Sequence, residues 1–228
     1  MDLIRKAVKK GYSALSEYES KQILAEYGIP CTREIMVTNL QELGDAAEEI
    51  GFPLVLKGCG RQIAHKTEKG LIRVDVRNLE EAIAAFREIM EELAGADSGV
   101  LVQEMIKGSR ELVVGLTRDA QFGPCVMFGL GGIFTEILED ISFRVAPLKK
   151  QDALEMMREI RAHKILGAIR GMTAADLEML AEILIRVGQI GMENEAIKEI
   201  DINPVILSRG KPIAVDALVV LEEVRSER

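Results

Sequence analysis

The sequence predicts an α+β protein with two unequal lobes and a cleft where they meet. Residues 30 to 95 alternate short apolar runs with helical patterns in the order β–α–β–β–α. From Val100 onward one strand-like run follows another, separated by turn sequences such as Lys107–Gly108 and Gly131–Gly132. Two helical stretches then precede a final group of strands. This change near residue 100, from alternating strands and helices to successive strands, predicts two lobes.

The composition is that of a globular protein and excludes several functional classes. With 228 residues, 48% hydrophobic and 29% charged, the chain can bury a sizeable core. A net charge of −8 gives no basic footprint for nucleic acid. No apolar run approaches the ~20 residues that span a bilayer, and the N-terminus has no secretory h-region. Three widely spaced cysteines fit reduced thiols better than disulfides or a zinc site. We therefore expect a cytoplasmic protein without a membrane or nucleic-acid partner.

The first hundred residues are predicted to combine helices with short strands. After a basic N-terminal helix, Ser16 and Glu19 form a capping-box pattern that starts a second helix, and Gly28 and Pro30 end it. The following elements are expected as strand 34–37, helix 40–50, a strand ending at Lys57, a strand starting at Leu71, and an amphipathic helix over 78–93.

The rest of the chain is predicted to be rich in strands. The expected strands cover 100–105, 110–116, 124–128, 133–138, 143–145, 197–202, 205–207 and 213–215. Helices are expected over 152–161 and 174–188, between the fifth and sixth of these strands. His163 falls at the end of the first of these helices, where a cationic side chain favours the helix dipole, so we expect a structural role for it.

The loop between Gly58 and Gly70 is the most informative stretch. At about 12 residues it is longer than most connections, which favours a functional loop. It carries His65, one of only two histidines in the chain. A neutral imidazole is an available nucleophile near pH 7, so we hypothesise that His65 accepts a phosphoryl group. Taken alone, a solvent-exposed loop histidine is the simpler interpretation.

Several residues are candidates for holding a nucleotide. Lys57, at an expected strand end, suits a phosphate oxygen, although a solvated lysine is commoner there. The linker Gln103-Glu104-Met105-Ile106 joins the lobes and could bond a base edge through its backbone. Glu111 could accept hydrogen bonds from ribose hydroxyls, or simply lie on an exposed strand face. Gly131 and Gly132, in a run of three glycines among four residues, let backbone N–H groups approach phosphate oxygens or merely connect two strands.

A metal site is predicted near the C-terminus. In the run Glu199-Ile200-Asp201-Ile202-Asn203-Pro204, strand alternation places Asp201 and Asn203 on one face. Asp216 ends the returning strand of a short hairpin and can lie beside Asn203. Two carboxylates and an amide oxygen are hard ligands suited to Mg²⁺ with nucleotide phosphates. The alternative is a strand whose polar face is simply hydrated.

These motifs together resemble the ATP-grasp beta subunit of the ADP-forming acyl-CoA synthetases, typified by archaeal acetyl-CoA synthetase. The resemblance extends from Leu15 to about Leu221. Its most specific stretches are Ile63-Ala64-His65-Lys66-Thr67, residues 121–134, residues 141–148, and Asp201-Ile202-Asn203-Pro204. The chain departs from many family members around the loop, where it has Gly60-Arg61 and Gly70-Leu71-Ile72.

The resemblance implies an ATP-grasp fold, with a smaller subdomain over 23–102 and a larger one formed by 1–22 and 103–228. It implies that a CoA-binding alpha subunit, in an α2β2 assembly, forms the acyl-phosphate and the thioester. The phosphoryl group would then pass through His65 to ADP, with Lys57, the linker 103–106 and Glu111 holding the nucleotide. Asn203 and Asp216, with Asp201, would hold Mg²⁺.

Two other functions remain open from the sequence. A different ATP-grasp ligase would form an acyl-phosphate directly and would not need His65. A regulatory module that lost catalysis would bind nucleotide without becoming phosphorylated. The acyl substrate and the preference for ADP over GDP lie beyond the sequence, since the acyl and CoA pockets would belong to the partner.

Overall fold

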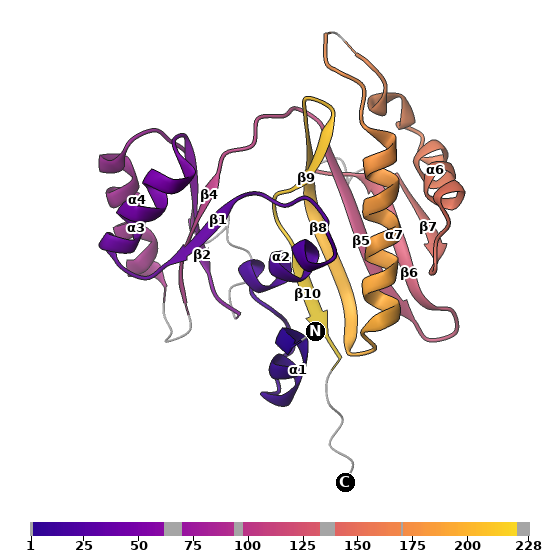
Figure 1. Ribbon diagram of the computed structural model, residues 1–228, viewed down its shortest axis with the longest axis horizontal. Coiled ribbons are helices and arrows are strands. Elements are labelled where there is room, and N and C mark those ends of the chain that lie inside the picture. The colour runs from indigo at the N-terminus through magenta and orange to yellow at the C-terminus, as the bar shows by residue number, and fades with distance from the viewer. Residues whose placement is uncertain (1, 62–69, 94–97, 133–139, 170, 223–228) are drawn as a thin grey trace. The chain divides into compact units, whose positions relative to one another are not determined.

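The computed structural model describes residues 2–61, 70–93, 98–132, 140–169 and 171–222 (Figure 1). The chain divides into two compact units. The small unit contains residues 16–18 and 32–106, and the large unit contains residues 1–15, 19–31 and 107–228. His65 and the expected strand 133–138 lie outside the described residues.

The small unit is a four-stranded antiparallel sheet with two helices on one side (Figure 1). The strand order is β1-β4-β2-β3. Its elements are β1 (Glu34–Val37), α3 (Leu40–Ile50), β2 (Leu54–Cys59), β3 (Ile72–Val76), α4 (Leu79–Glu92) and β4 (Gly99–Glu104). Both helices begin where an asparagine caps them: Asn39 accepts a hydrogen bond from the Glu42 amide, and Asn78 accepts one from the Glu81 amide.

Strand alternation divides the small sheet into two faces. Leu54 and Leu56 of β2 join the buried cluster that contains Phe86 and Ile89 of α4. The intervening residues of β2 therefore point to the other face, away from the helices. Lys57 lies on that face, directly paired with Leu101 of β4. This second face carries the polar residues of interest.

The large unit is a six-stranded antiparallel sheet with helices packed on one face. The order along the sheet is β10-β8-β5-β6-β7, and β9 pairs with β8. Its strands are β5 (Glu111–Asp119), β6 (Gly123–Leu130), β7 (Ile141–Val145), β8 (Ile197–Ser208), β9 (Lys211–Ala214) and β10 (Leu218–Leu221). Its helices are α1 (Asp2–Lys9), most of α2 (Glu17–Glu26), α6 (Lys150–Glu159), the short 3₁₀ helix η1 (His163–Leu166) and α7 (Leu177–Glu193).

The helix-covered face of the large sheet forms its core. Phe128 of β6 and Ile202 of β8 are fully buried in the cluster that also contains Leu184 of α7. Arg118, near the end of β5, donates hydrogen bonds to the carbonyls of Gly191, Asn194 and Ile197. These bonds tie the end of α7 to the start of β8. The opposite face of the sheet carries the candidate site residues described below.

The boundary between the units differs from the predicted one. Residues 23–31 were expected in the smaller subdomain, but they belong to the large unit. The reason is that Ile23, Leu24 and Ile29 are buried in the large unit's core. Residues 103–106 fall in the small unit instead of the larger subdomain, because β4 continues through Glu104 and pairs there with Leu54.

Two elements at the C-terminal end also differ from expectation. The predicted strands 197–202 and 205–207 form one twelve-residue strand, β8, which pairs with three neighbouring strands. Strand β10 was not predicted.

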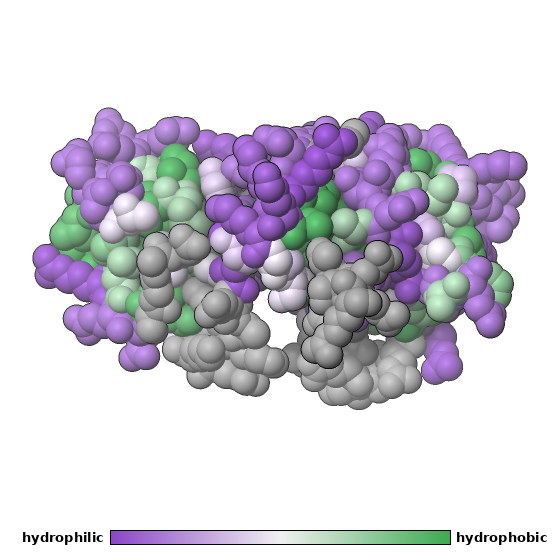
Figure 2. Space-filling view, turned by 90° about the horizontal axis from the view of Figure 1, so that it is seen from below, coloured by the Kyte–Doolittle hydropathy of each residue, from purple (hydrophilic) through white to green (hydrophobic). Residues whose placement is uncertain are grey.

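Within the described part of the chain, none of the helices is both long enough and apolar enough to cross a membrane. On the face drawn in Figure 2, hydrophilic residues predominate and hydrophobic ones form separate patches between them.

Candidate functional site

The segment that carries His65 connects two paired strands of the small unit. Strand β2 ends at Cys59 and β3 begins at Ile72. The two strands are antiparallel neighbours, with Lys57 opposite Ile72. His65 itself lies outside the described residues. In the sequence, His65 falls between β2 and β3.

Lys57 is buried and ion-paired, which differs from the expected strand-end position. Strand β2 continues to Cys59, because Gly58 and Cys59 still pair with β4. The Lys57 ammonium lies 2.7 Å from the carboxylate of Glu17, and the two side chains are 6% and 1% exposed. A buried charge is stable only with a close partner. Glu17 therefore holds the Lys57 ammonium in place. This role of Glu17 was not predicted, because nothing in the sequence links it to a residue forty positions away.

The linker Gln103–Ile106 closes the same side of the small sheet. Gln103 is buried and pairs with Val55, so its side chain lies on the same face as Lys57. The amide N–H groups of Glu104 and Met105 already donate to the carbonyls of Arg33 and Pro53, at 3.0 and 3.3 Å. They are therefore not available to a base edge, contrary to the simplest form of the prediction.

The side chain of Glu104 is likewise engaged inside the small unit. Its carboxylate accepts hydrogen bonds from the Arg33 amide at 2.7 Å and from the Arg33 Nε at 3.3 Å. Met105 and Ile106 are half-buried. Within the linker, the groups suited to contact a ligand are the carbonyl groups and the apolar side chains of Met105 and Ile106.

Glu111 and the glycine loop meet in the large unit. The Gly131 amide donates to the carbonyl of Glu111 at 2.8 Å. A Cβ atom on Gly131 would lie 2.8 Å from the carbonyl oxygen of Leu112. At Gly132, where φ is +67°, a Cβ would lie 2.5 Å from the Glu111 carboxylate. Glycine is therefore required at Gly131 by close approach to the β5 backbone and favoured at Gly132 by the positive φ, and the exposed Glu111 carboxylate lies directly over the loop.

The three predicted metal ligands come together around β8. Asp201 and Asn203 lie on the face of β8 opposite the buried Ile200 and Ile202. The backbone N–H of Asn203 donates to the backbone carbonyl of Asp216 at 3.2 Å, which holds these two residues side by side. Burial, together with the negative charges of Glu199 and Asp216, raises the pKa of Asp201 to about 6.

This donor set fits a hard divalent cation. Among the residues that the structure describes, no group of three or more His, Cys, Asp or Glu side chains could hold a metal. The set here has two carboxylates and an amide, and Mg²⁺ usually takes one or two carboxylates and completes its shell with water and phosphate oxygens. Burial is the main cause of the raised pKa of Asp201, and the neighbouring negative charges of Glu199 and Asp216, which a cation would neutralise, raise it further. The residues present therefore fit Mg²⁺.

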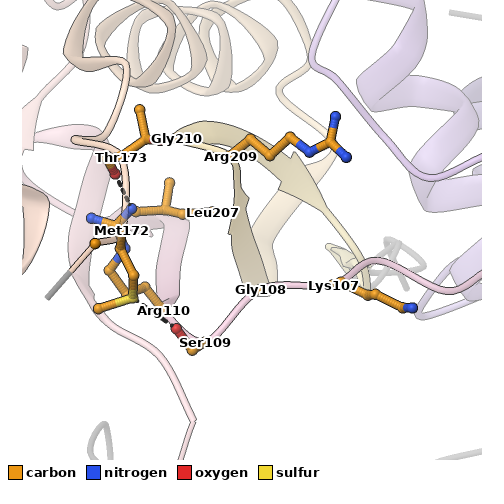
Figure 3. Close-up of a pocket in the computed structure, with 10 residues that line it drawn as sticks. Lys107, Gly108, Ser109, Arg110, Met172, Thr173, Leu207, Arg209 and Gly210 are labelled. Atoms are coloured by element: carbon orange, nitrogen blue, oxygen red, sulfur yellow. Dashed lines mark hydrogen bonds between the residues drawn. The ribbon is translucent and has the colours of Figure 1, made fainter. Parts of the chain in front are cut away.

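A pocket of about 230 Å³ in the large unit lies at the β8–β9 turn and the approach to β5. Its Arg110 guanidinium is buried and donates to the carbonyls of Ile165, Gly167 and Thr173. The Ser109 hydroxyl contacts the Met172 sulfur. Figure 3 shows Arg209 and Lys107 extending away from this cluster. The Arg110 guanidinium and the Ser109 hydroxyl are thus bonded within the protein.

His163 does not end a helix as predicted, because α6 ends at Glu159 and His163 starts the 3₁₀ helix η1. Its Nδ1 lies 3.1 Å from the carbonyl of Ile160, and the residue is exposed. The predicted site residues thus form two groups. Lys57 and the linker lie on one face of the small unit, and Glu111, the glycine loop and the three metal-ligand candidates lie in the large unit.

Comparison with known proteins covers nearly the whole chain. The family model for the ATP-grasp domain matches residues 6–221. The beta subunit of acetate–CoA ligase (ADP-forming) I from Pyrococcus furiosus is 47% identical over 225 residues, which is 96% of this chain and 97% of that subunit. Acetate–CoA ligase (ADP-forming) I from Archaeoglobus fulgidus is 38% identical over 97% of this chain, but the match covers only 33% of that longer polypeptide.

Solved structures of a similar protein exist. The dinucleotide forming acetyl-coenzyme A synthetase 1 of Candidatus Korarchaeum cryptofilum, with coenzyme A and Ca-AMPCP, matches with a TM-score of 0.93 and 45% identity over 97% of this chain and 99% of that one. A second structure of it contains coenzyme A and Mg-AMPPCP, and its phosphohistidine segment points towards the nucleotide binding site; the TM-score is 0.86, with 46% identity over the same shares of the two chains.

Proposed function

The chain belongs to the ATP-grasp family, and we propose that it is the nucleotide-binding beta subunit of an ADP-forming acyl-CoA synthetase. The reaction is acyl-CoA + ADP + phosphate = carboxylic acid + CoA + ATP. The observation that carries this proposal is the end-to-end match to the Pyrococcus beta subunit, at 47% identity. Both chains have nearly the same extent, so the similarity covers a whole subunit rather than one motif.

His65 is the phosphoryl carrier in this proposal. An imidazole nitrogen of neutral His65 attacks phosphorus, and the bond from phosphorus to its previous carrier on the partner breaks. A terminal phosphate oxygen of ADP then attacks the same phosphorus, the P–N bond breaks, and ATP leaves with neutral His65 restored. The phosphohistidine segment of the Korarchaeum protein supports this choice.

The described residues would bind and orient the nucleotide. Lys57, held by Glu17, would place a positive charge against a phosphate oxygen. The Gly131 N–H is already donated to the Glu111 carbonyl, so Gly132 would be the glycine that presents its backbone N–H to the phosphates, and Glu111 would accept from ribose hydroxyls. Mg²⁺, held by Asp201, Asn203 and Asp216, would neutralise phosphate charge when bound. Phosphoryl transfer depends mainly on such positioning and charge neutralisation.

A CoA-binding alpha subunit would complete the enzyme. In the Archaeoglobus relative, the part similar to this chain is 33% of one polypeptide, so two thirds of that polypeptide lies outside the match. This chain would therefore not complete the reaction alone. We place it in an α2β2 assembly with its alpha partner.

The test is to incubate the chain and its alpha partner with Mg²⁺ and ATP, and to look for acid-labile phosphate by mass spectrometry. The wild type should carry phosphate on His65, and added ADP should remove it. His65→Ala should carry none, whereas the matched control His163→Ala should be labelled normally. A wild-type complex that binds nucleotide without any label on His65 would overturn the relay and favour direct ligase chemistry or a regulatory role.

A further inference from the structure

We propose that an exposed apolar stripe on β7 is the surface on which the CoA-binding partner docks. The stripe consists of Ile141, Phe143 and Val145. This inference rests on the proposed function, because it assumes that the chain works with such a partner. It adds the face of the subunit that the partner covers.

The stripe is apolar, exposed and directed away from the helices. Ile141, Phe143 and Val145 are 37%, 46% and 48% exposed. The alternate residues face the helix side: the Ser142 hydroxyl donates to the carbonyl of Met156 at 3.0 Å, and Arg144 pairs with Glu159 of α6. Strand alternation therefore directs all three apolar side chains to the opposite face.

The position of the stripe in the sheet is unusual for an apolar surface. Among the described strands, β7 is the last in the sheet. Natural proteins usually protect such edge strands with charged side chains or proline, because an apolar edge invites association. An edge that is apolar at every second position is therefore expected to be covered in the working assembly.

The stripe lies on the same sheet face as the candidate metal site. Asp201 of β8 is directly opposite Gly115 of β5, Gly115 is opposite Met127 of β6, and Met127 is opposite Phe143. Directly opposed residues in an antiparallel sheet point to the same side. Three strand spacings separate Asp201 from Phe143, which is about 14 Å across the sheet. A partner bound on the stripe would thus stand beside the site to which a phosphoryl group must be delivered.

The alpha partner is the occupant favoured over a second copy of this chain. The Archaeoglobus relative carries two thirds of its length outside the part similar to this chain, so a large additional portion has to pack somewhere. In the proposed reaction the phosphoryl group comes from that portion and reaches the face that carries Asp201. A second copy covering the stripe would occupy this approach and supply no phosphoryl donor.

The first test measures assembly of the chain with its cognate CoA-binding subunit. The double variant Phe143→Asp/Val145→Asp should weaken the complex by about 30-fold or more in dissociation constant, since buried aromatic anchors dominate interfaces. Met192→Asp is the matched control, because Met192 is 49% exposed but lies on α7, which packs on the other face of the sheet. ATP binding by the isolated double variant should stay within about twofold of wild type, which shows that the unit is folded.

The second test replaces Phe143 by the photo-crosslinking residue benzoyl-phenylalanine in an otherwise wild-type assembly. A crosslink to the CoA-binding subunit supports the proposal. A crosslink to a second copy, or to another part of the same chain, overturns it. Normal assembly of the double variant would also overturn it while leaving the proposed function intact. Failure of the wild-type chain to assemble with any CoA-binding subunit would instead count against the proposed function itself.

Discussion

Replacing Asp201 by asparagine should stabilise the metal-free protein near neutral pH. In the folded chain, burial and the charges of Glu199 and Asp216 raise the pKa of Asp201 to about 6, from an ordinary value of 3.8. The native state therefore binds a proton more tightly than the unfolded state at this position. Stability from this group is fully present below pH 3.8 and is lost as pH rises through 6.

The magnitude follows from the size of the shift. A difference of 2.2 pKa units corresponds to an upper limit of about 3 kcal/mol at pH 7. At pH 4.5 the same linkage gives about 1 kcal/mol, because this pH is only slightly above the ordinary pKa of 3.8, at which the unfolded carboxyl begins to ionise. Asparagine has a similar shape and no charge, so it removes the pH-dependent part. Any change in packing or hydrogen bonding adds an offset that does not vary with pH.

The assay is urea unfolding of both proteins in EDTA at pH 4.5 and pH 7. The stability gain of Asp201→Asn should be about 2 kcal/mol larger at pH 7 than at pH 4.5. Glu195→Gln, which neutralises an exposed acid of the large unit, should show no such increase. An equal gain at the two pH values, or none at either, would refute the reasoning that burial and neighbouring negative charge raise the pKa of Asp201.

Three further substitutions test the site and its supports. Glu17→Gln should destabilise the small unit by about 3 kcal/mol, because it leaves a buried ammonium without a counter-charge, and it should also weaken ATP binding. The control Glu88→Gln, which changes an exposed ion pair, should unfold near the wild-type urea midpoint. Gly131→Ala should cost about 1–3 kcal/mol because its Cβ meets the β5 backbone, whereas Gly44→Ala, in open space within α3, should be neutral or stabilising in thermal melts. Arg118→Lys should lower stability by about 2 kcal/mol in urea unfolding, because an ammonium cannot reach all three carbonyls.

Residues that act through local patterns were predictable from the sequence. Alternation along β8 predicted that Asp201 and Asn203 share a face, and the structure agrees. The helices over 40–50 and 78–93 were also foreseeable, because periodicity and capping asparagines are properties of adjacent residues. Local signals of this kind are readable without knowledge of the fold.

Features that depend on distant contacts were not predictable. Glu17 looked like part of a helix start, and only the fold reveals that its carboxylate meets Lys57. The domain boundary was misplaced because periodicity shows that α2 has an apolar face but not which core receives it. Strand β10 is a four-residue apolar run whose identity depends on pairing with β8. In each case the deciding interaction joins residues far apart in the chain.

The arginines at the two ends of β5 have a consequence for how the protein responds to ionic strength. Arg110 and Arg118 direct their guanidinium groups to neutral carbonyls instead of to carboxylates. Dissolved ions screen the long-range attraction of exposed charge pairs, but they have little effect on such short, enclosed hydrogen bonds. The chain also carries eight more negative than positive charges, and their mutual repulsion is reduced by added electrolyte. A concentrated salt solution should therefore raise the free energy of unfolding rather than lower it.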